Sequence, residues 1–281
     1  AYVDIAAYNY ADARYLKDIE RFPNRIIVGG ESYPSNIDLN WKLVMENSQI
    51  IGDFTWTGWD YLGEAGIGAI HYDPTAVMSG VMGGYPWLTA WCGDIDIIGN
   101  RRPISYYREI VFGLRKDPYI AVLRPDNYDN EPIQSMWSWS DSVSSWSWNG
   151  HEGKRIKVEV YADAEEVELL VNGKSSGKLA AGEENRFRAE FDTIYEPGEI
   201  LAVAYSKGEE VGRMSLRSAT GAVQLKIEAD RTEIDATDSD LSFIMISLVD
   251  EQGNLYNNAD RKVSIQVEGA GVLQGYGSAH P

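Results

Sequence analysis

The sequence predicts a multidomain protein in which an α/β part with parallel strands is followed by all-β sandwiches. Three observations support this prediction. Strand-like and helix-like segments alternate over about the first 113 of the 281 residues. From about residue 130, short strand-like segments follow one another with turns between them. All nine tryptophans lie between Trp41 and Trp148, so the composition changes with the pattern.

The α/β part begins with a regular succession of five segments. They are a strand at 3–10, a helix at 11–22, a strand at 25–30, a helix at 36–47 and a strand at 49–59. Pro23 closes the first helix, and Asn36 is a suitable N-cap for the second. Strands that alternate with helices in this way are expected to run parallel, with each helix forming the crossover.

A long loop rich in glycine and tryptophan is expected at about 60–100. The segment 103–113, PISYYREIVFG, then reads as a helix that closes the α/β part and ends at Gly113. We expect the α/β domain to span 1–113 and a linker to occupy 114–124.

The rest of the chain predicts two β-sandwiches. Residues 125–218 contain several strand-like runs, among them PIQSMWSWS and VELLV, and Asn172-Gly173 is a strong two-residue hairpin signal. Residues 219–281 repeat the theme. Because a sandwich of the immunoglobulin type needs about 100 residues, we expect the second one to be truncated.

Charge and composition exclude several classes of protein. The formal net charge is −18 and there is no basic face, so nucleic acid and anionic membranes are not expected as partners. A single cysteine excludes an internal disulfide framework. No apolar run approaches the length of a membrane span.

The polar motifs do not predict a cofactor or a metal. The glycine-rich stretch 63–70, GEAGIGAI, lacks the spacing of a dinucleotide-binding loop. The three histidines lie far apart, without the spacing of zinc ligands. Asp94 and Asp96 could hold a hard cation, but we favour a role in capping their loop.

Aromatic and polar side chains follow the predicted ends of all three strands of the α/β part. These side chains are Tyr8, Asn9 and Tyr10, then Glu31 and Tyr33, then Trp56, Trp59 and Asp60. Parallel strands of a barrel bring such ends to one mouth, and tryptophan suits the apolar faces of sugar rings. For each aromatic alone, packing in a core or loop is the simpler interpretation, but the coincidence of three strand ends favours a sugar site.

Four stretches of residues 2–113 resemble the end of the catalytic barrel of glycoside hydrolase family 2, the β-galactosidase family. The stretches are VDIAAYNYADARY, PNRIIVGGESYPSNIDLNWKLV, IIGDFTWTGWDYLGEAGIG and PWLTAWCGDIDIIGNRRPISYYREIVFG. The resemblance implies a partial (β/α)8 TIM barrel with about its last three βα units. It also implies an immunoglobulin-like sandwich at 125–218 and a second, truncated bacterial immunoglobulin-like sandwich at 219–281.

The resemblance also implies roles for site residues. Glu31 matches the nucleophile at the end of the seventh strand, and Tyr10 matches the tyrosine that orients this carboxylate. Trp56 matches the tryptophan that lines the sugar subsite. Asn9, Trp59 and Asp60 are expected to bind substrate because they share the strand ends. Gly29 and Gly30 are expected to permit a tight backbone at the nucleophile.

The family takes its acid/base from a glutamate that follows an asparagine at the end of the fourth strand. No Asn-Glu pair precedes Glu31 in this sequence, so the chain would carry the nucleophile without the proton donor. We therefore expect the isolated chain to be inactive.

The function expected from this resemblance is that of part of a retaining glycosidase acting on β-galactosides or related β-glycosides. Its partner would be a carbohydrate, and the exposed barrel strands could mediate self-association. No cofactor is expected, although a structural cation in the intact enzyme stays open. A periplasmic or extracellular location of bacterial type is expected.

The alternative from another class is a non-catalytic protein for carbohydrate binding or surface adhesion, built from sandwiches. The run MWSWSDSVSSWSW at 136–148 could be an aromatic platform for sugars, or a strand pair that packs on the barrel. The barrel-like first third favours the enzyme, since an adhesin would not need it.

Overall fold

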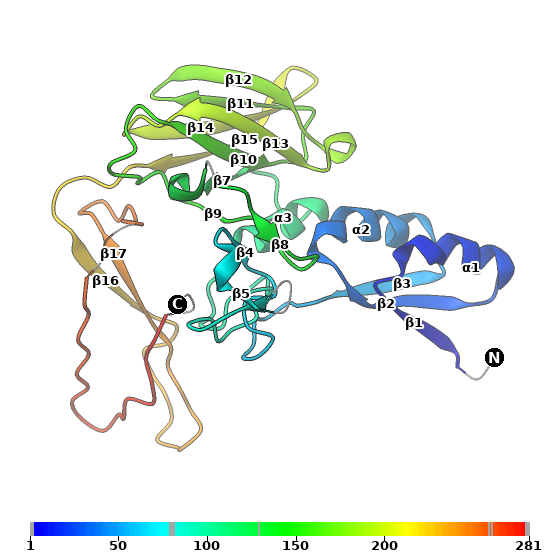
Figure 1. Ribbon diagram of the computed structural model, residues 1–281, viewed down its shortest axis with the longest axis horizontal. Helices are drawn as coiled ribbons and strands as arrows, with labels where there is room; N and C mark the ends of the chain where they lie inside the picture. The colour runs from blue at the N-terminus through cyan, green and yellow to red at the C-terminus, as the bar shows by residue number, and fades with distance from the viewer. Residues whose placement is uncertain (1–2, 79–81, 129, 258, 260, 279–281) are drawn as a thin grey trace.

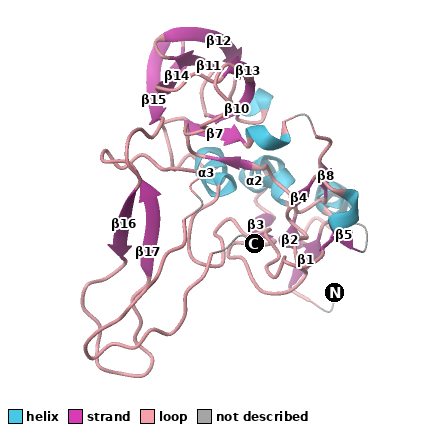
Figure 2. Ribbon diagram, turned by 60° about the vertical axis from the view of Figure 1, so that its left-hand side comes forward, coloured by secondary structure: helices cyan, strands magenta, loops and turns pink. Residues whose placement is uncertain are grey.

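The computed structural model describes residues 3–78, 82–128, 130–257, 259 and 261–278, and its fold is mostly β. A parallel sheet with helices forms one arm, two stacked antiparallel sheets form a second part, and a two-stranded sheet lies at the far side (Figure 1). Figure 2 shows the same three parts after a turn of 60°.

The parallel sheet has the strand order β1-β2-β3. Its elements are β1 (Ile5–Asn9), η1 (Asp12–Arg14), α1 (Tyr15–Arg21), β2 (Ile26–Ser32), η2 (Pro34–Asn36), α2 (Ile37–Glu46) and β3 (Ile50–Thr55). The helices cover one face, where Tyr15, Ile27 and Ile50 are buried in one cluster. The predicted order of strands and crossover helices is therefore present in the structure.

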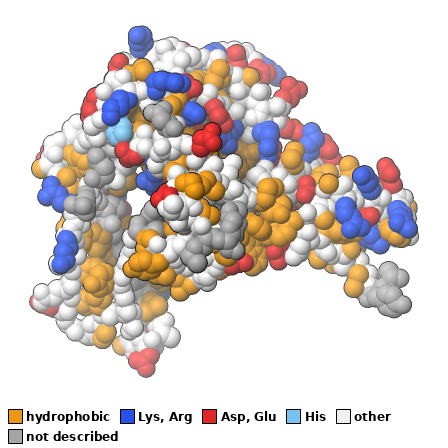
Figure 3. All heavy atoms as spheres, in the orientation of Figure 1, with side chains coloured by type: hydrophobic (Ala, Val, Ile, Leu, Met, Phe, Trp, Pro, Cys, Tyr) orange, Lys and Arg blue, Asp and Glu red, His pale blue; other side chains and the backbone are white. Residues whose placement is uncertain are grey.

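The other face of this sheet is apolar and open. Ile26, Ile51 and Phe54 are 38%, 55% and 67% exposed. Figure 3 shows hydrophobic side chains gathered where the sheet meets the loop that follows it. Strand residues of this kind are normally covered on both faces when the strands are parallel.

The loop after β3 carries little regular structure. Its short elements are β4 (Ile70–His71), η3 (Pro74–Ala76), β5 (Val77–Met78) and β6 (Met82–Gly83). Helix α3 (Pro103–Val111) follows and begins with a proline at a position where the missing N–H costs nothing. It buries Tyr107 and Ile110.

Two four-stranded antiparallel sheets follow, with the orders β13-β10-β7-β9 and β12-β11-β14-β15. The elements of this part of the chain are β7 (Tyr119–Leu123), η4 (Pro125–Asn127), β8 (Ile133–Gln134), β9 (Ser142–Val143), β10 (Arg155–Tyr161), β11 (Glu166–Val171), β12 (Lys174–Ala180), η5 (Glu183–Asn185), β13 (Arg188–Ile194), β14 (Glu199–Ser206) and β15 (Glu209–Arg217). Strand β8 belongs to neither sheet and pairs with β4. Side chains from both sheets meet in one apolar core that includes Trp146 and Leu169. The hairpin predicted at Asn172-Gly173 joins β11 to β12, with both residues at positive φ.

The predicted linker at 114–124 is wrong for its second half. Residues 119–123, YIAVL, form β7, which pairs with β10 and buries four of its five residues. A short apolar run of this kind is typical of a strand buried on both faces. It therefore belongs to the sheet and does not connect two independent bodies.

A second apolar cluster fastens the α/β part to the sandwich. Tyr107 and Ile110 of α3 pack with Tyr119 and Tyr161 from β7 and β10. The Tyr107 hydroxyl also donates to the backbone oxygen of Arg186 at 3.0 Å. The outer face of one sandwich sheet is thus the surface on which α3 rests.

Polar contacts reinforce this junction near the start of α2. The Arg186 guanidinium donates to both carboxylate oxygens of Asp38, at 2.7 and 2.6 Å. It also donates to the Ser35 backbone oxygen at 2.5 Å. Asp38 is buried, so a residue of the sandwich neutralises a buried carboxylate of the α/β part.

The tryptophan-rich run does not form the strand that its alternation predicts. Only Ile133–Gln134 and Ser142–Val143 are strands in this region. Trp146 and Trp148 are buried in the sandwich core at 0% and 4% exposure. These two tryptophans cannot serve as an exposed platform for a sugar.

The last part contains β16 (Gln224–Ala229) and β17 (Ile244–Val249), which pair antiparallel. Residues 261–278, which lie in the predicted second sandwich, are irregular. Among the residues that the structure describes, no helix is both long and apolar enough to cross a membrane.

The buried carboxylate of Glu159 offers a test of the junction. It accepts hydrogen bonds from Ser140 at 2.9 Å, Tyr161 at 2.7 Å and Arg188 at 2.5 Å. We expect Arg188→Met to lower the free energy of unfolding by about 3–5 kcal/mol, because it leaves a buried charge without its cation. Urea unfolding measures this. Adding Glu159→Gln should recover much of the loss, and a loss below about 1 kcal/mol would place the pair among weak surface pairs.

Candidate active site

The ends of the three parallel strands are joined by backbone hydrogen bonds. Asn9 of β1 is the register partner of Glu31 in β2. The Tyr10 N–H donates to the Glu31 backbone oxygen at 2.7 Å, and the Trp56 N–H donates to the Ser32 backbone oxygen at 3.0 Å. The structure therefore brings four of the six predicted site residues, Asn9, Tyr10, Glu31 and Trp56, to one edge of the sheet.

The two glycines before Glu31 face opposite sides of the sheet. A Cβ on Gly29 would overlap the carboxylate of Asp53, on the side covered by the helices. A Cβ on Gly30 would lie 2.6 Å from Asn9 Oδ1, on the open side. Ser32 lies on the helix side again, where its hydroxyl donates to Asp53 at 2.8 Å.

Strict alternation would have placed Ser32 on the same side as Gly30. The pairing of β2 with β3 is irregular between Gly29 and Ser32, so one extra residue is accommodated there. In the pairing with β1, Tyr8 faces Gly29 and the next residue, Asn9, faces Glu31, so Gly30 is the residue without a partner. The carboxylate of Glu31 adds to the raised pKa of the Tyr10 phenol, so the two groups lie close together. The Gly-Gly pair thus permits the irregularity that turns Glu31 away from the buried helix side.

This arrangement predicts that the two glycines differ in their tolerance of a side chain. We expect Gly29→Ala to lower the free energy of unfolding by about 1–3 kcal/mol, because Asp53 is held by Ser32 and cannot move aside freely. Gly30→Ala should cost less, because Asn9 is exposed and can change rotamer. Thermal or urea unfolding of both variants compares them, and equal losses would contradict the assigned directions.

Tyr10 is surrounded by aromatic rings. Its ring stacks on Tyr33 at 4.3 Å between centroids, and Trp137 packs edge-on at 5.7 Å. The Trp137 Nε1–H donates to the Tyr10 hydroxyl at 3.0 Å. Burial raises the pKa of Tyr10 to about 12; the hydrogen bond from Trp137 lowers it, and the one to Glu31 adds to the increase. Near neutral pH the phenol therefore keeps its proton and acts as a donor.

Sequence reasoning missed Trp137 as a site residue. It lies 127 positions from Tyr10 and was considered only within the tryptophan-rich run. The unusual composition of that run was the available signal. Nothing in its spacing distinguishes Trp137 from the buried tryptophans that follow it.

Trp56 begins the loop after β3 and is half-buried. Its Nε1–H donates to the Tyr61 hydroxyl at 3.0 Å, and Tyr61 in turn donates to Glu64. The ring packs against a small cluster that contains the buried Cys92. Burial raises the pKa of the Cys92 thiol to about 11, so it stays protonated near neutral pH.

Trp59 and Asp60 lie further along this loop. Trp59 is 58% exposed. The buried Asp60 carboxylate accepts the backbone N–H groups of Trp91 and Cys92 at 3.1 and 3.2 Å. These contacts give Asp60 a role in holding the loop together, and the predicted contacts of both residues with substrate stay predictions.

Asp94 and Asp96 have partners within the protein. Asp96 accepts the backbone N–H groups of Ile98 and Asn100 at 3.0 and 2.8 Å, which confirms the predicted capping of its loop. Asp94 instead pairs with Arg108 of α3 at 2.5 and 3.1 Å. For Asp94 the role is an ion pair that ties the loop to a helix.

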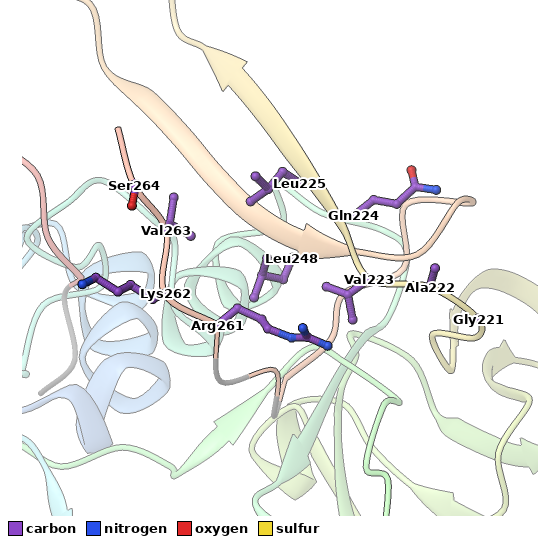
Figure 4. A pocket seen from close by; sticks show the side chains of 10 residues that line it. All are labelled: Gly221, Ala222, Val223, Gln224, Leu225, Leu248, Arg261, Lys262, Val263 and Ser264. Atoms are coloured by element: carbon purple, nitrogen blue, oxygen red, sulfur yellow. The ribbon is translucent and has the colours of Figure 1, made fainter. Parts of the chain in front are cut away.

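A cavity of about 490 Å³ is lined by none of these strand-end residues. It is formed by β16, β17 and the segment 261–264 (Figure 4). Arg261 and Lys262 are among its lining residues, which include no aspartate or glutamate. Because carboxyl groups are needed for the usual glycosidase chemistry, the strand ends remain the candidate site.

Two family models match the sandwich and C-terminal parts of the chain. A model described as "Domain of unknown function (DUF4982)" matches residues 153–212. A model described as "Glycoside hydrolase family 2 C-terminal domain 5" matches residues 225–281.

The chain is also similar to curated and structurally solved proteins. It is 28% identical over 242 residues to the β-galactosidase BoGH2A of Bacteroides ovatus, covering 85% of this chain and 24% of that protein. A solved glycosyl hydrolase family 2 member from Bacteroides cellulosilyticus is 39% identical, with a TM-score of 0.78. The match covers 90% of this chain and 32% of the solved chain. Another solved member, from Bacteroides cellulosilyticus DSM 14838, is 35% identical, with a TM-score of 0.70. This match covers 90% of this chain and 30% of the solved chain.

The β-rich fold, its C-terminal domain and these relatives define a part of a multidomain glycoside hydrolase. The chain spans about a quarter to a third of the length of these relatives, 24% to 32%. It belongs to glycoside hydrolase family 2, and it corresponds to a C-terminal part of such proteins.

Proposed function

We propose that this chain is the part of a retaining β-glycosidase that carries the nucleophile, Glu31. The observation that supports this most is the placement of Glu31 at the end of the middle parallel strand, where the Tyr10 N–H donates to its backbone oxygen at 2.7 Å and the Tyr10 phenol lies near its carboxylate. A rigid strand end fixes the position from which a nucleophile attacks the anomeric carbon. We propose that the phenol of Tyr10 orients this carboxylate.

We propose that β1, β2 and β3 with their helices are the last three units of a (β/α)8 barrel. The parallel order of the strands supports this, as do the helices on one face and the open apolar face on the other. In such barrels the catalytic groups lie at the carboxyl ends of the strands, where Glu31 lies. The immunoglobulin-like character of 125–218 and a second sandwich at 219–281 belong to the same proposal.

The proposed chemistry needs a second carboxyl group. In a retaining enzyme the acid/base lies about 5–5.5 Å from the nucleophile, protonates the leaving group and then activates water. The bond between the sugar and its leaving oxygen breaks as the carboxylate of Glu31 forms the glycosyl-enzyme ester, which water then hydrolyses. We propose that the acid/base comes from another part of the full-length protein.

The proposed substrates are β-galactosides or related β-glycosides. The relative BoGH2A is described as a β-galactosidase, and another relative, from Formosa agariphila, as a putative β-glucuronidase. Trp56 offers an aromatic ring at the same edge of the sheet as Glu31, and Asn9 offers an exposed amide for sugar hydroxyls. A periplasmic or extracellular place of action and a mechanism without a cofactor are parts of this proposal.

Replacement of the nucleophile tests the proposal in a full-length protein that contains this chain. We expect Glu31→Gln to lower kcat for a nitrophenyl β-glycoside on the order of 10⁴-fold, as for other residues that act directly in the reaction. Glu20→Gln, in the same α/β part but exposed on α1, is the matched control. A 2-deoxy-2-fluoro glycoside should label Glu31, as peptide mass spectrometry would show. Near-normal turnover in Glu31→Gln would end the proposal.

The isolated chain is expected to turn over no glycoside, since loss of a general acid alone removes about 10²–10⁴-fold of the rate. We also propose that it self-associates through the open face of its parallel sheet. Light scattering should show a species larger than 31.4 kDa, and Ile51→Ser with Phe54→Ser should reduce its size. A monodisperse monomer would contradict this second statement and leave the first unaffected.

A further inference from the structure

Trp137 is the part of the strand-end site that comes from beyond α3. Its indole Nε1–H donates to the Tyr10 hydroxyl at 3.0 Å. Its ring also meets Tyr33 at 5.4 Å between centroids, with the planes at 71°. Tyr10, Tyr33 and Trp137 thus form a cluster of three aromatic rings, the aromatic trio, beside Glu31.

The backbone that carries Trp137 is attached to the loop after β3. Strand β8 pairs with β4, and its register joins Ile70 to Gln134. Beyond β8, the Ser135 hydroxyl donates to the Ile67 backbone oxygen, and the Ser138 hydroxyl donates to that of Ala69 at 2.9 Å.

The same two serines also shape the turn itself. The Ser135 N–H donates to the Ser138 hydroxyl at 3.0 Å, and the Trp137 N–H donates to the Ser135 hydroxyl at 3.0 Å. Hydroxyls that bond nearby backbone groups compete with a strand ladder. The alternation of serine and tryptophan therefore produces a fixed turn, and this turn presents Trp137 to Tyr10.

The hydroxyl of Tyr10 can be rotated about its C–O bond, and its oxygen can accept as well as donate. The indole N–H is a donor only, so Tyr10 must be the acceptor in its contact with Trp137. This leaves the phenolic proton for a second partner. The carboxylate of Glu31 is the acidic group beside it, since the Tyr10 N–H donates to the Glu31 backbone oxygen at 2.7 Å and this carboxylate adds to the raised pKa of the phenol. An ordered chain of donors from Trp137 through Tyr10 to Glu31 is the arrangement that these contacts favour.

We propose that Trp137 is a positioning residue of the glycosidase site, which acts by directing the Tyr10 hydroxyl toward the carboxylate of Glu31. This inference rests on the proposed function of Glu31. It means that the turn at Ser135–Ser138, which leads into the sandwich, helps to orient the nucleophile. A purely structural role would be packing of the indole against Tyr10 and Tyr33, and the two roles differ in whether the N–H matters.

Trp139 provides a matched control for the loss of an indole N–H. Its Nε1–H donates to the Tyr161 hydroxyl, also at 3.0 Å, at the junction with the sandwich. Trp137→Phe and Trp139→Phe therefore remove the same kind of hydrogen bond, and both keep an aromatic ring in place. Only the first lies in the proposed donor chain.

The test uses a full-length protein that contains this chain and a dinitrophenyl 2-deoxy-2-fluoro glycoside, whose leaving group needs no protonation. We expect Trp137→Phe to slow covalent labelling of Glu31 about 5- to 10-fold, the value of one net hydrogen bond. Trp139→Phe should leave the labelling rate within about twofold of the rate of the unaltered protein. The acidic limb of the kcat/KM profile should move to higher pH in Trp137→Phe alone.

A double-mutant cycle decides whether Trp137 acts through Tyr10. In a Tyr10→Phe background, Trp137→Phe should cause little further loss, because the group that it directs is already absent. Full additivity of the two losses would overturn the proposal. So would equal labelling rates in Trp137→Phe, Trp139→Phe and the unaltered protein. Normal turnover in Glu31→Gln would instead overturn the proposed function, which keeps the two failures apart.

A measurement on the chain itself tests the first link without any activity. In a sample with ¹⁵N-labelled indoles, Trp137→Phe identifies the Trp137 signal by its absence. Tyr10→Phe should move that signal upfield, since the indole proton loses its acceptor, and should leave the Trp139 signal in place. An unmoved Trp137 signal would contradict the donor chain whatever the enzyme does.

Discussion

The packing of α3 against the outer face of the β7–β10 sheet is the contact on which the rest of the structure depends. The parallel sheet has three strands and one covered face, so it has few contacts of its own beyond α1 and α2. Tyr107 and Ile110 join it to Tyr119 and Tyr161 through one continuous apolar cluster. Since α3 fixes where the chain enters β7, it also determines where the next segment can return to the strand ends.

The sequence allowed prediction of the order of elements in the α/β part and of the edge at which the site lies. Apolar runs with helical segments between them are sufficient to indicate parallel strands, and parallel strands bring Asn9, Glu31 and Trp56 together. The direction of Glu31 was less predictable, because strict alternation would group it with Ile27 and Gly29. The irregular pairing at the glycines reverses this, and the pattern of hydrophobic residues carries no record of it.

Two features could not be predicted because they depend on partners distant in sequence. The sequence predicts a linker that includes YIAVL, because a strand of five residues becomes evident only from its pairing with β10. The alternation at Ser135–Ser138 predicts a strand, whereas the structure has a turn. The hydroxyls that hold this turn bond carbonyl groups of a loop 68 and 69 residues away, which the local pattern does not reveal. Trp137 became a site residue through that turn.

The attachment of this turn has a consequence for how such proteins exchange parts during evolution. A recombination point between α3 and the turn at Ser135–Ser138 would transfer Trp137 with the incoming sandwich and separate it from the loop whose carbonyl groups hold it. β7 is already a strand of that sandwich, yet it precedes the turn in the chain. A crossover before the turn separates Trp137 from its loop, and one after the turn separates β7 from β10. The parallel sheet and the sandwich are therefore inherited together.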